Sequence, residues 1–371
     1  MSTPTTSTQV ALKNSPPGFI NPNFGESDST FEIKQRPIEP LKDGQLLVKI
    51  LLISNDPTQR GWIRAKDSKQ RYYVPPVEIG APMESLAIAE VIESKSSKYA
   101  KGDLVNGKFY WADYIVVSDA TVFNKIDKSL GFPLEFYVSV LGMTSLTAFF
   151  GLTEAGEMKK FLTEKPEKPY TLLVSAASGA TGSVVVQIAK HVLGADKVIG
   201  ISGSDEKCRW VESLGADLCV NYKEENYQKQ IDEFLGDGLV DYYFDNVGGS
   251  ILDYALTKMN KFGHVISCGS ISTYNSKGDN SAPGIKNWGE LTVNSLTVKG
   301  FIVSDYFPKF EQGFQHLGKA VKEGKIKAQG AYHVDTLTGD TPEKKLEQIP
   351  KIWNQLFVGE KPNGKLITKV A

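Results

Sequence analysis

The sequence predicts an α/β protein with two domains, one a doubly wound parallel sheet and the other a mostly β, partly open barrel. Strands and helices alternate from about residue 143 to residue 303, which is typical of a parallel sheet with helices on both faces. Short β-type runs broken by glycine and proline fill about residues 45 to 123, as in a β domain. The length of 371 residues exceeds what one hydrophobic core usually supports.

The first part of the chain supplies the β domain. Residues 1–8 have neither the basic nor the apolar region of a secretory signal, and we expect a short disordered lead there. The predicted strands that follow are 46–51, 87–92 and 113–117. The apolar stretch 136–152 contains serine, threonine and glycine and is slightly short for a membrane span, so it predicts a buried helix.

The middle of the chain supplies the parallel sheet, and the end returns to the first domain. The alternating elements are 172–175, 184–192, 197–201, 206–214, 218–221, 240–245, 251–256, 264–268 and 295–301. An amphipathic helix 310–323, a helix near 343–356 and a strand 365–370 follow. The predicted boundaries are therefore 1–142 and 318–371 for the β domain, with 143–317 inserted between them.

A run of small residues connects the first strand of the parallel sheet to its helix. Ser175 to Gly182 follows the apolar residues Thr171 to Val174 and precedes Val184 to Lys190. Small residues allow backbone amides and a helix N-terminus to approach a pyrophosphate closely, as in a Rossmann-type dinucleotide-binding domain. Ala176 stands where the first glycine of that motif would be, and close strand–helix packing alone also produces such turns.

The second strand of this domain favours NADPH over NADH. Residues Lys197 to Ile201 are not followed by the acidic residue that binds ribose hydroxyls in NAD-type domains. Ser204 and Lys207 follow instead, and they can donate a hydrogen bond and a positive charge to a 2′-phosphate. The alternative is that Ser204 only caps the next helix and Lys207 is a solvated surface charge.

The composition excludes several classes of protein. The net charge is −1, from 42 basic and 43 acidic residues, so we expect neither nucleic acid nor an anionic membrane as a partner. The three cysteines, Cys208, Cys219 and Cys268, lack the spacing of a disulfide framework or a structural zinc site. These features predict a cytoplasmic protein in a reducing compartment.

A series of segments spread over nearly the whole chain carries a resemblance to a known family. They are Asn55–Gly61, Tyr73–Pro76, Lys101–Val105, Leu141–Ala148, Gly179–Gly182, Gly203–Cys208, Asn221–Lys223, Phe244–Gly249 and Cys268–Asn275. In these segments the sequence resembles the zinc-independent medium-chain dehydrogenase/reductases. It is most similar to the NADPH-dependent alkenal double-bond reductases, a group that includes the leukotriene B4 dehydrogenase/prostaglandin reductases. The resemblance implies that the β domain is GroES-like and catalytic.

The resemblance also implies roles for individual residues in binding NADPH. Gly179, Ala180, Thr181 and Gly182 would hold the pyrophosphate, and Ser204, Lys207 and Tyr222 the 2′-phosphate end. Asn246 would bind the ribose beside the nicotinamide, although an ordinary turn residue is the alternative. Cys268, Gly269 and Ser270 would line the cofactor, and Phe301, Ile302 and Val303 would meet the carboxamide. Cys268 would be a small buried residue rather than a nucleophile.

The zinc alcohol dehydrogenases, another branch of the superfamily, are disfavoured. Residues 1–150 contain neither cysteine nor histidine, and all four histidines lie later in the chain, so no metal site is predicted.

Two departures from the alkenal reductase pattern concern the substrate end. Thr58 and Gln59 follow Asp56–Pro57 where relatives carry tyrosine, and Asn363 is shifted by one residue from the asparagine that touches the nicotinamide.

Reduction of a conjugated C=C bond fits these residues better than oxidation of an alcohol, because it requires only a hydride and a donor at the carbonyl oxygen. The resemblance implies that Tyr274, with the nicotinamide ribose, stabilises an enolate and relays a proton. A tyrosine that merely packs over the cofactor is the alternative.

An NADPH quinone reductase and a non-catalytic NADPH-binding sensor or scaffold remain alternative functions. The resemblance further implies a homodimer, with Ser295–Gly300 as an edge strand that pairs.

Overall fold

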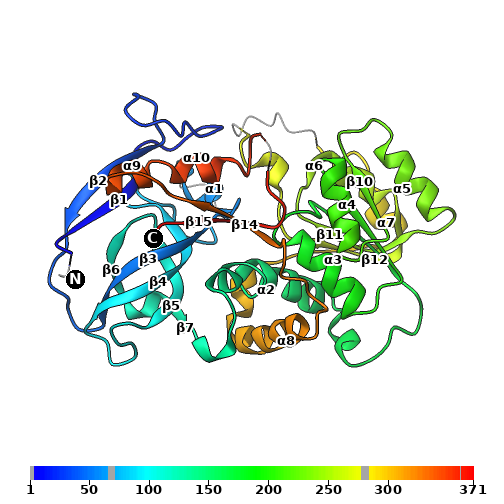
Figure 1. The fold of residues 1–371 in the computed structure, drawn as a ribbon. Helices are drawn as coiled ribbons and strands as arrows, with labels where there is room; N and C mark the ends of the chain where they lie inside the picture. The colour runs from blue at the N-terminus through cyan, green and yellow to red at the C-terminus, as the bar shows by residue number, and fades with distance from the viewer. Residues whose placement is uncertain (1–3, 66–71, 277–283, 360) are drawn as a thin grey trace. The chain divides into compact units, whose positions relative to one another are not determined.

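The computed structural model describes residues 4–65, 72–276, 284–359 and 361–371. The chain forms two compact units. Unit 1 comprises Met1–Val138, Tyr274–Gly278 and His333–Ala371, and unit 2 comprises Ser139–Thr273 and Asp279–Tyr332. Figure 1 shows the elements of both units. The chain therefore passes from unit 2 into unit 1 between Thr273 and Tyr274.

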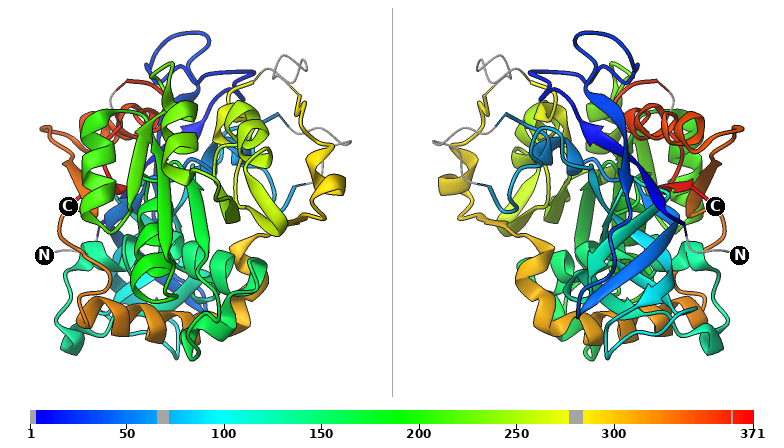
Figure 2. Two further views of the ribbon diagram at one scale, coloured as in Figure 1. Left: turned by 90° about the vertical axis from the view of Figure 1, so that its right-hand side faces the viewer. Right: turned by 90° about the vertical axis from the view of Figure 1, so that its left-hand side faces the viewer.

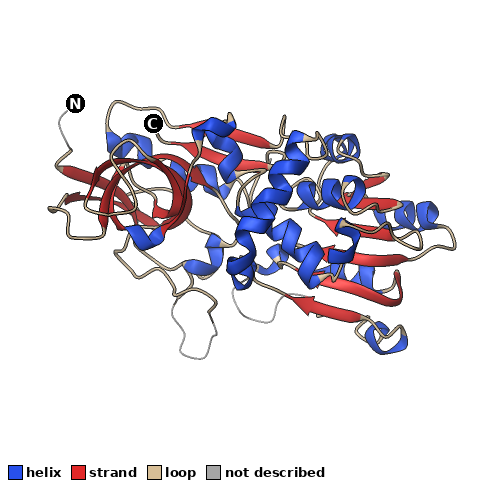
Figure 3. Ribbon diagram, turned by 90° about the horizontal axis from the view of Figure 1, so that it is seen from below, coloured by secondary structure: helices blue, strands red, loops and turns tan. Residues whose placement is uncertain are grey.

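Unit 1 is built on a curled sheet with the strand order β14-β15-β3-β4-β5-β7, in which β6 also pairs with β3. Figure 3 shows these strands wrapping into a barrel. A separate antiparallel pair, β1 and β2, accompanies it. The strands are β1 (Thr6–Leu12), β2 (Phe31–Pro37), β3 (Gln45–Ser54), β4 (Glu84–Ser94), β5 (Leu104–Tyr110), β6 (Tyr114–Ser118), β7 (Val122–Lys125), β14 (Tyr332–Thr336) and β15 (Lys365–Lys369). The helices are α1 (Gln59–Trp62), α9 (Pro342–Leu346) and α10 (Ile349–Asn354).

An aromatic cluster joins the two ends of the chain inside unit 1. Trp353 of α10 packs edge-on against Trp111 and Phe31, with ring centroids 5.7 and 6.4 Å apart. All three side chains are fully buried. Because large aromatic side chains contribute much of the stability of a core, this contact holds the C-terminal segment to residues that lie more than 200 positions earlier in the chain.

Unit 2 contains a six-stranded sheet with the order β10-β9-β8-β11-β12-β13, in which every pairing is parallel. Figure 2 shows helices on both faces of this sheet. The strands are β8 (Thr171–Ser175), β9 (Lys197–Ser202), β10 (Leu218–Asn221), β11 (Val240–Asp245), β12 (Met259–Ser267) and β13 (Thr297–Gly300). The helices are α2 (Met143–Phe150), α3 (Gly182–His191), α4 (Asp205–Ser213), α5 (Tyr227–Leu235), α6 (Gly249–Leu256), α7 (Glu290–Val293) and α8 (Phe310–Lys322).

The predicted fold class is confirmed, including the Rossmann strand order with its reversal between β8 and β11. Two local predictions were wrong. Residues from Thr6 onward form β1 instead of a disordered lead, because β2 pairs with them along their whole length. The helix expected near residues 343–356 is two helices, α9 and α10, because Pro350 has no N–H and cannot continue the backbone hydrogen bonds of α9.

Within the described ranges, no helix combines the length and the apolar character needed to cross a bilayer.

Candidate functional site

The turn between β8 and α3 contains backbone amides that have no hydrogen-bond partner among the described residues. The N–H groups of Ala180, Thr181 and Gly182 make no hydrogen bond to any described residue. A Cβ atom on Gly182 would lie 2.3 Å from the carbonyl oxygen of Ala176, so only glycine fits there. Free amides at the start of a ten-residue helix form a site for an anion such as a phosphate.

The turn after β9 brings together the three residues predicted for the 2′-phosphate end. Ser204 is the N-cap of α4, and its side chain accepts a hydrogen bond from the backbone N–H of Lys207 at 3.3 Å. The ring of Tyr222, just after β10, lies against Gly203, where a Cβ would come within 3.2 Å of it. Ser204 therefore caps α4, which was the alternative interpretation of this residue. A hydroxyl that accepts in a cap can still donate to a ligand.

Asn246, directly after β11, is held by Ser175 at the end of β8. Its side-chain amide donates to the Ser175 carbonyl oxygen at 2.8 Å, and its backbone N–H donates to the Ser175 hydroxyl at 2.9 Å. These two bonds fix the orientation of the side chain, and its Oδ1 atom makes no hydrogen bond to a described residue. Asn246 thus presents a fixed acceptor at the point where the strand order reverses.

Asp245 organises this region, although the sequence analysis assigned it no role. It is 1% exposed, and its Oδ1 accepts hydrogen bonds from the hydroxyls of Tyr243 and Ser175 at 2.8 and 3.2 Å. The N–H groups of Val247 and Gly248 donate to the same oxygen at 3.0 and 2.9 Å. Burial, reinforced by the Asp245 charge, raises the pKa of Tyr243 well above 10. Tyr243 therefore stays protonated and donates.

The segment after β12 is tied to the same aspartate. The N–H groups of Cys268 and Gly269 both donate to the backbone oxygen of Asp245, at 2.9 and 3.1 Å. Loss of solvation, followed by the charge of Asp245, raises the pKa of the Cys268 thiol to about 12. The thiol is thus protonated at neutral pH and is a poor nucleophile. Ser270 lies beside Gly248, 3.3 Å from where a Cβ would be.

The last predicted segment of unit 2 leaves the sheet at the end of β13. Phe301 packs edge-on against Phe244 with ring centroids 6.4 Å apart. The Ile302 carbonyl accepts a hydrogen bond from the Asp305 N–H at 3.0 Å, and Val303 begins a short 3-10 helix that ends at Lys309. The carboxyl ends of parallel strands share one edge of the sheet, so the structure places all the predicted residues of unit 2 along one edge.

Tyr274 and Asn363 belong to unit 1. The Tyr274 carbonyl oxygen accepts a hydrogen bond from the Arg64 guanidinium at 3.2 Å. The Oδ1 atom of Asn363 is buried and has no partner among the described residues. A buried acceptor without a donor costs free energy, which a ligand amide would recover.

Two segments from opposite ends of the chain meet in unit 1. Lys365 is 2% exposed, and its ammonium donates to the Asn55 carbonyl oxygen at 2.9 Å and to the Asp56 carboxylate. The Trp353 indole N–H donates to the Asp56 carbonyl oxygen at 3.0 Å. Nothing in the local sequence pattern indicates that these two segments pair.

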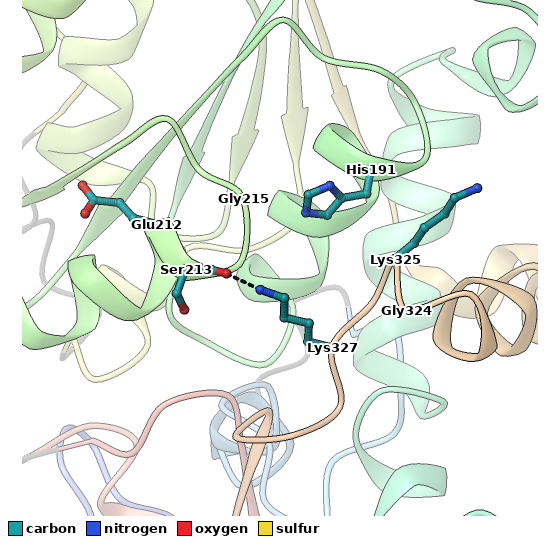
Figure 4. Close-up of a pocket in the computed structure, with 7 residues that line it drawn as sticks. All are labelled: His191, Glu212, Ser213, Gly215, Gly324, Lys325 and Lys327. Atoms are coloured by element: carbon teal, nitrogen blue, oxygen red, sulfur yellow. Dashed lines mark hydrogen bonds between the residues drawn. The ribbon is translucent and has the colours of Figure 1, made fainter.

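A hollow of about 350 Å³ in unit 2 is lined by His191, Glu212, Ser213, Gly215, Gly324, Lys325 and Lys327 (Figure 4). It is found where α3 ends at His191 and α4 ends at Ser213, so it lies at the opposite end of each helix from the turn that precedes that helix. The His191 ring bonds the Leu214 carbonyl oxygen at 2.8 Å, and the Lys327 ammonium donates to the Ser213 carbonyl oxygen at 2.5 Å. These side chains stabilise helix ends, and the hollow contains none of the predicted site residues.

Comparison with known proteins covers both units. Residues 9–126 match a family model described as the N-terminal domain of oxidoreductase, and residues 180–319 match one described as zinc-binding dehydrogenase. Within the described ranges, no group of three or more histidine, cysteine, aspartate or glutamate side chains is arranged to hold a metal ion.

Three curated relatives cover nearly the whole chain. The protein of Saccharomyces cerevisiae named uncharacterized membrane protein YML131W is 37% identical over 98% of both chains. The putative NADP-dependent oxidoreductase YfmJ of Bacillus subtilis is 38% identical, over 92% of this chain and 93% of its own. The 2-alkenal reductase (NADP(+)-dependent) of Nicotiana tabacum is 34% identical, over 98% of this chain and 97% of its own.

Among solved structures, CurA of Vibrio vulnificus in complex with NADPH superposes with a TM-score of 0.81. It is 27% identical, and the match covers 98% of this chain and 99% of CurA.

Proposed function

The chain belongs to the medium-chain dehydrogenase/reductase superfamily, in the branch that includes 2-alkenal and prostaglandin reductases, and on this premise we propose that it reduces the C=C bond of α,β-unsaturated aldehydes and ketones with NADPH. The observation that carries the proposal is the 34% identity to a tobacco 2-alkenal reductase over 98% of the chain. The site geometry adds independent support for the cofactor.

The residues of unit 2 fit a dinucleotide. The free amides of Ala180, Thr181 and Gly182 would bind its pyrophosphate. Ser204, Lys207 and Tyr222 would bind the 2′-phosphate, and Asn246 the ribose beside the nicotinamide. Cys268, Gly269 and Ser270, with Phe301, Ile302 and Val303, would line the nicotinamide end. Asn363 in unit 1 has a buried acceptor that would suit the carboxamide N–H.

Bound NADPH would supply the hydride that adds to the β-carbon of the substrate. The task of the protein is then to hold the carbonyl oxygen while negative charge develops on it and a proton reaches the product. Tyr274 would donate a hydrogen bond to that oxygen, because a tyrosine hydroxyl is ordinarily protonated at neutral pH. The net change is one hydride and one proton added across the C=C bond.

The test follows NADPH consumption with a medium-chain 2-alkenal, an enone and a quinone as separate acceptors, and identifies the products by mass spectrometry. Saturated aldehyde or ketone is the expected product. Turnover of the quinone alone would replace the proposal with a quinone reductase. Binding of NADPH without turnover of any acceptor would favour a non-catalytic sensor or scaffold.

Lys207→Ala is expected to weaken the binding of NADPH and to leave the binding of NADH nearly unchanged. Because a charge-assisted hydrogen bond to a phosphate contributes about 1.5–3 kcal/mol, KM for NADPH should rise about 10- to 100-fold while KM for NADH stays nearly constant. Lys229→Ala is the matched control, since Lys229 is an exposed lysine of the same unit that pairs with Glu233 on α5. Equal losses with NADPH and NADH would contradict the assignment.

We further propose a homodimer in which β13 strands of two copies pair. The structure places β13 at the end of the strand order, and Val298 on it and Val293 just before it are 42% and 74% exposed. An exposed apolar edge invites pairing with another strand. Val298→Asp should therefore halve the mass measured by light scattering, whereas Val358→Asp, at an exposed valine of unit 1, should not. A wild-type monomer would refute the proposal.

A further inference from the structure

Two arginines of unit 1 hold the segment that carries Tyr274. The Nε atom of Arg60, in α1, donates to the side-chain oxygen of Asn275 at 3.0 Å. The Nη2 atom of Arg64 donates to the backbone oxygen of Tyr274 at 3.2 Å. All four residues belong to unit 1. The backbone of Tyr274 and the side chain of Asn275 are thus each held by a guanidinium group.

The Arg60 guanidinium also bonds a third segment. Its Nη2 atom donates to the backbone oxygens of Pro16 and Gly18 at 2.9 and 2.5 Å. One planar group therefore connects residues 16–18, helix α1 and Asn275. Lysine could not reproduce this arrangement, because its single nitrogen lacks the fixed, divergent donors of arginine.

The position of Arg60 is costly for stability. Its side chain is 1% exposed, the described residues offer it no carboxylate, and its Nη1 atom has no hydrogen-bond partner among them. Burial, with a smaller contribution from the Arg64 charge, lowers the pKa of Arg60 to about 10, so the group is still protonated at neutral pH. A charge buried among neutral acceptors is unfavourable. Proteins tolerate such departures chiefly at functional sites.

On its other side, Tyr274 is preceded by residues that are held within unit 2. The Ser272 hydroxyl donates to the Val247 carbonyl oxygen at 2.6 Å, and the Thr273 N–H donates to the Ser270 carbonyl oxygen at 2.9 Å. The chain then enters unit 1 at Tyr274. There the Tyr274 carbonyl oxygen accepts a hydrogen bond from Arg64, and the Asn275 side-chain oxygen accepts one from Arg60.

We propose that Arg60 and Arg64 are positioning residues that set the place of the Tyr274 hydroxyl for the proton-donating step. The kinetic consequences of this inference rest on the proposed function. The hydrogen bonds that anchor the segment do not depend on that function. Neither arginine is assigned contact with substrate or cofactor.

The kinetic test is a double-mutant cycle on enal reduction. Arg60→Lys should lower kcat about 10- to 100-fold, the range that a misplacement of about 1 Å produces, and should leave KM for NADPH unchanged. In the Tyr274→Phe background, Arg60→Lys should lower kcat no further, because the group that it positions is already gone. Equal losses in both backgrounds would overturn the proposal.

The anchoring is tested without catalysis by amide hydrogen exchange of the free protein. Arg60→Lys and Arg64→Lys should each accelerate exchange in a peptide covering residues 271–276 and leave peptides of β8 unchanged. Arg36→Lys is the matched control, because Arg36 is an exposed arginine of unit 1 that bonds the Gly80 carbonyl oxygen at 2.8 Å. Unchanged exchange in both variants would overturn the proposal.

The two measurements also separate failure of this inference from failure of the proposed function. A wild-type protein that reduces no enal refutes the function, while the exchange experiment still decides whether the arginines hold the segment. If Arg60→Lys does not fold, Arg64→Lys carries both tests, because Arg64 is only partly buried and its one hydrogen bond to a described residue is that to Tyr274.

Discussion

Tyr274→Phe is expected to lower kcat for enal reduction by about 10²- to 10³-fold, because removing one donor to a developing oxyanion typically costs about 2.7–4 kcal/mol. KM for NADPH should change little, since the phenyl ring keeps the shape of the tyrosine and all the predicted cofactor contacts except that of Asn363 lie in unit 2. Steady-state kinetics with a 2-alkenal at saturating NADPH measures the effect.

Tyr99→Phe is the control for this variant. Tyr99 is a partly buried tyrosine that packs against the core of the same unit, and its hydroxyl lies outside the proposed machinery. Full activity in Tyr274→Phe would remove the catalytic role and leave the alternative that the ring only packs over the cofactor. A comparable loss in Tyr99→Phe would indicate a general effect on the fold of unit 1.

Lys365→Met is expected to destabilise unit 1 by about 3–5 kcal/mol, the usual cost of leaving one partner of a buried ion pair uncompensated. The variant leaves the Asp56 carboxylate, which is 7% exposed, without its partner ammonium group. Urea unfolding followed by tryptophan fluorescence reports on this unit through Trp111 and Trp353, both fully buried. The unfolding midpoint should fall markedly, whereas Lys369→Met on the exposed end of the same strand should leave it unchanged.

The paired variant Asp56→Asn with Lys365→Met is expected to recover part of this loss. Burial lowers the pKa of Lys365 even though the Asp56 charge opposes that shift, so the attraction does not fully offset the cost of removing the ammonium from water. Removing both charges avoids that cost, and asparagine can retain the hydrogen bond with Ser54. A paired variant less stable than Lys365→Met alone would contradict this account.

Predictions from local patterns succeeded where the pattern is complete within one segment. The strand, small-residue turn and helix from Thr171 to His191 and the amphipathic helix Phe310–Lys322 formed as expected. Strand β1 was missed because its residues Thr6–Gln9 are polar and gain their structure from pairing with β2. Whether such a segment forms a strand depends on a pairing partner, which the local sequence pattern does not reveal.

The sequence by itself predicted a parallel sheet in which the turn at Gly179–Gly182, Asn246 and the segments after β12 and β13 each follow a strand, and the carboxyl ends of parallel strands share one edge of a sheet. Only the tertiary structure decided that Lys365 pairs with Asp56 and that Arg60 holds Asn275, partners separated by 309 and 215 residues. Such pairs depend on burial and on the relative placement of whole segments. Neither burial nor the placement of distant segments can be read from local periodicity. The residues that anchor Tyr274 and the C-terminal strand could therefore be found only in the folded chain.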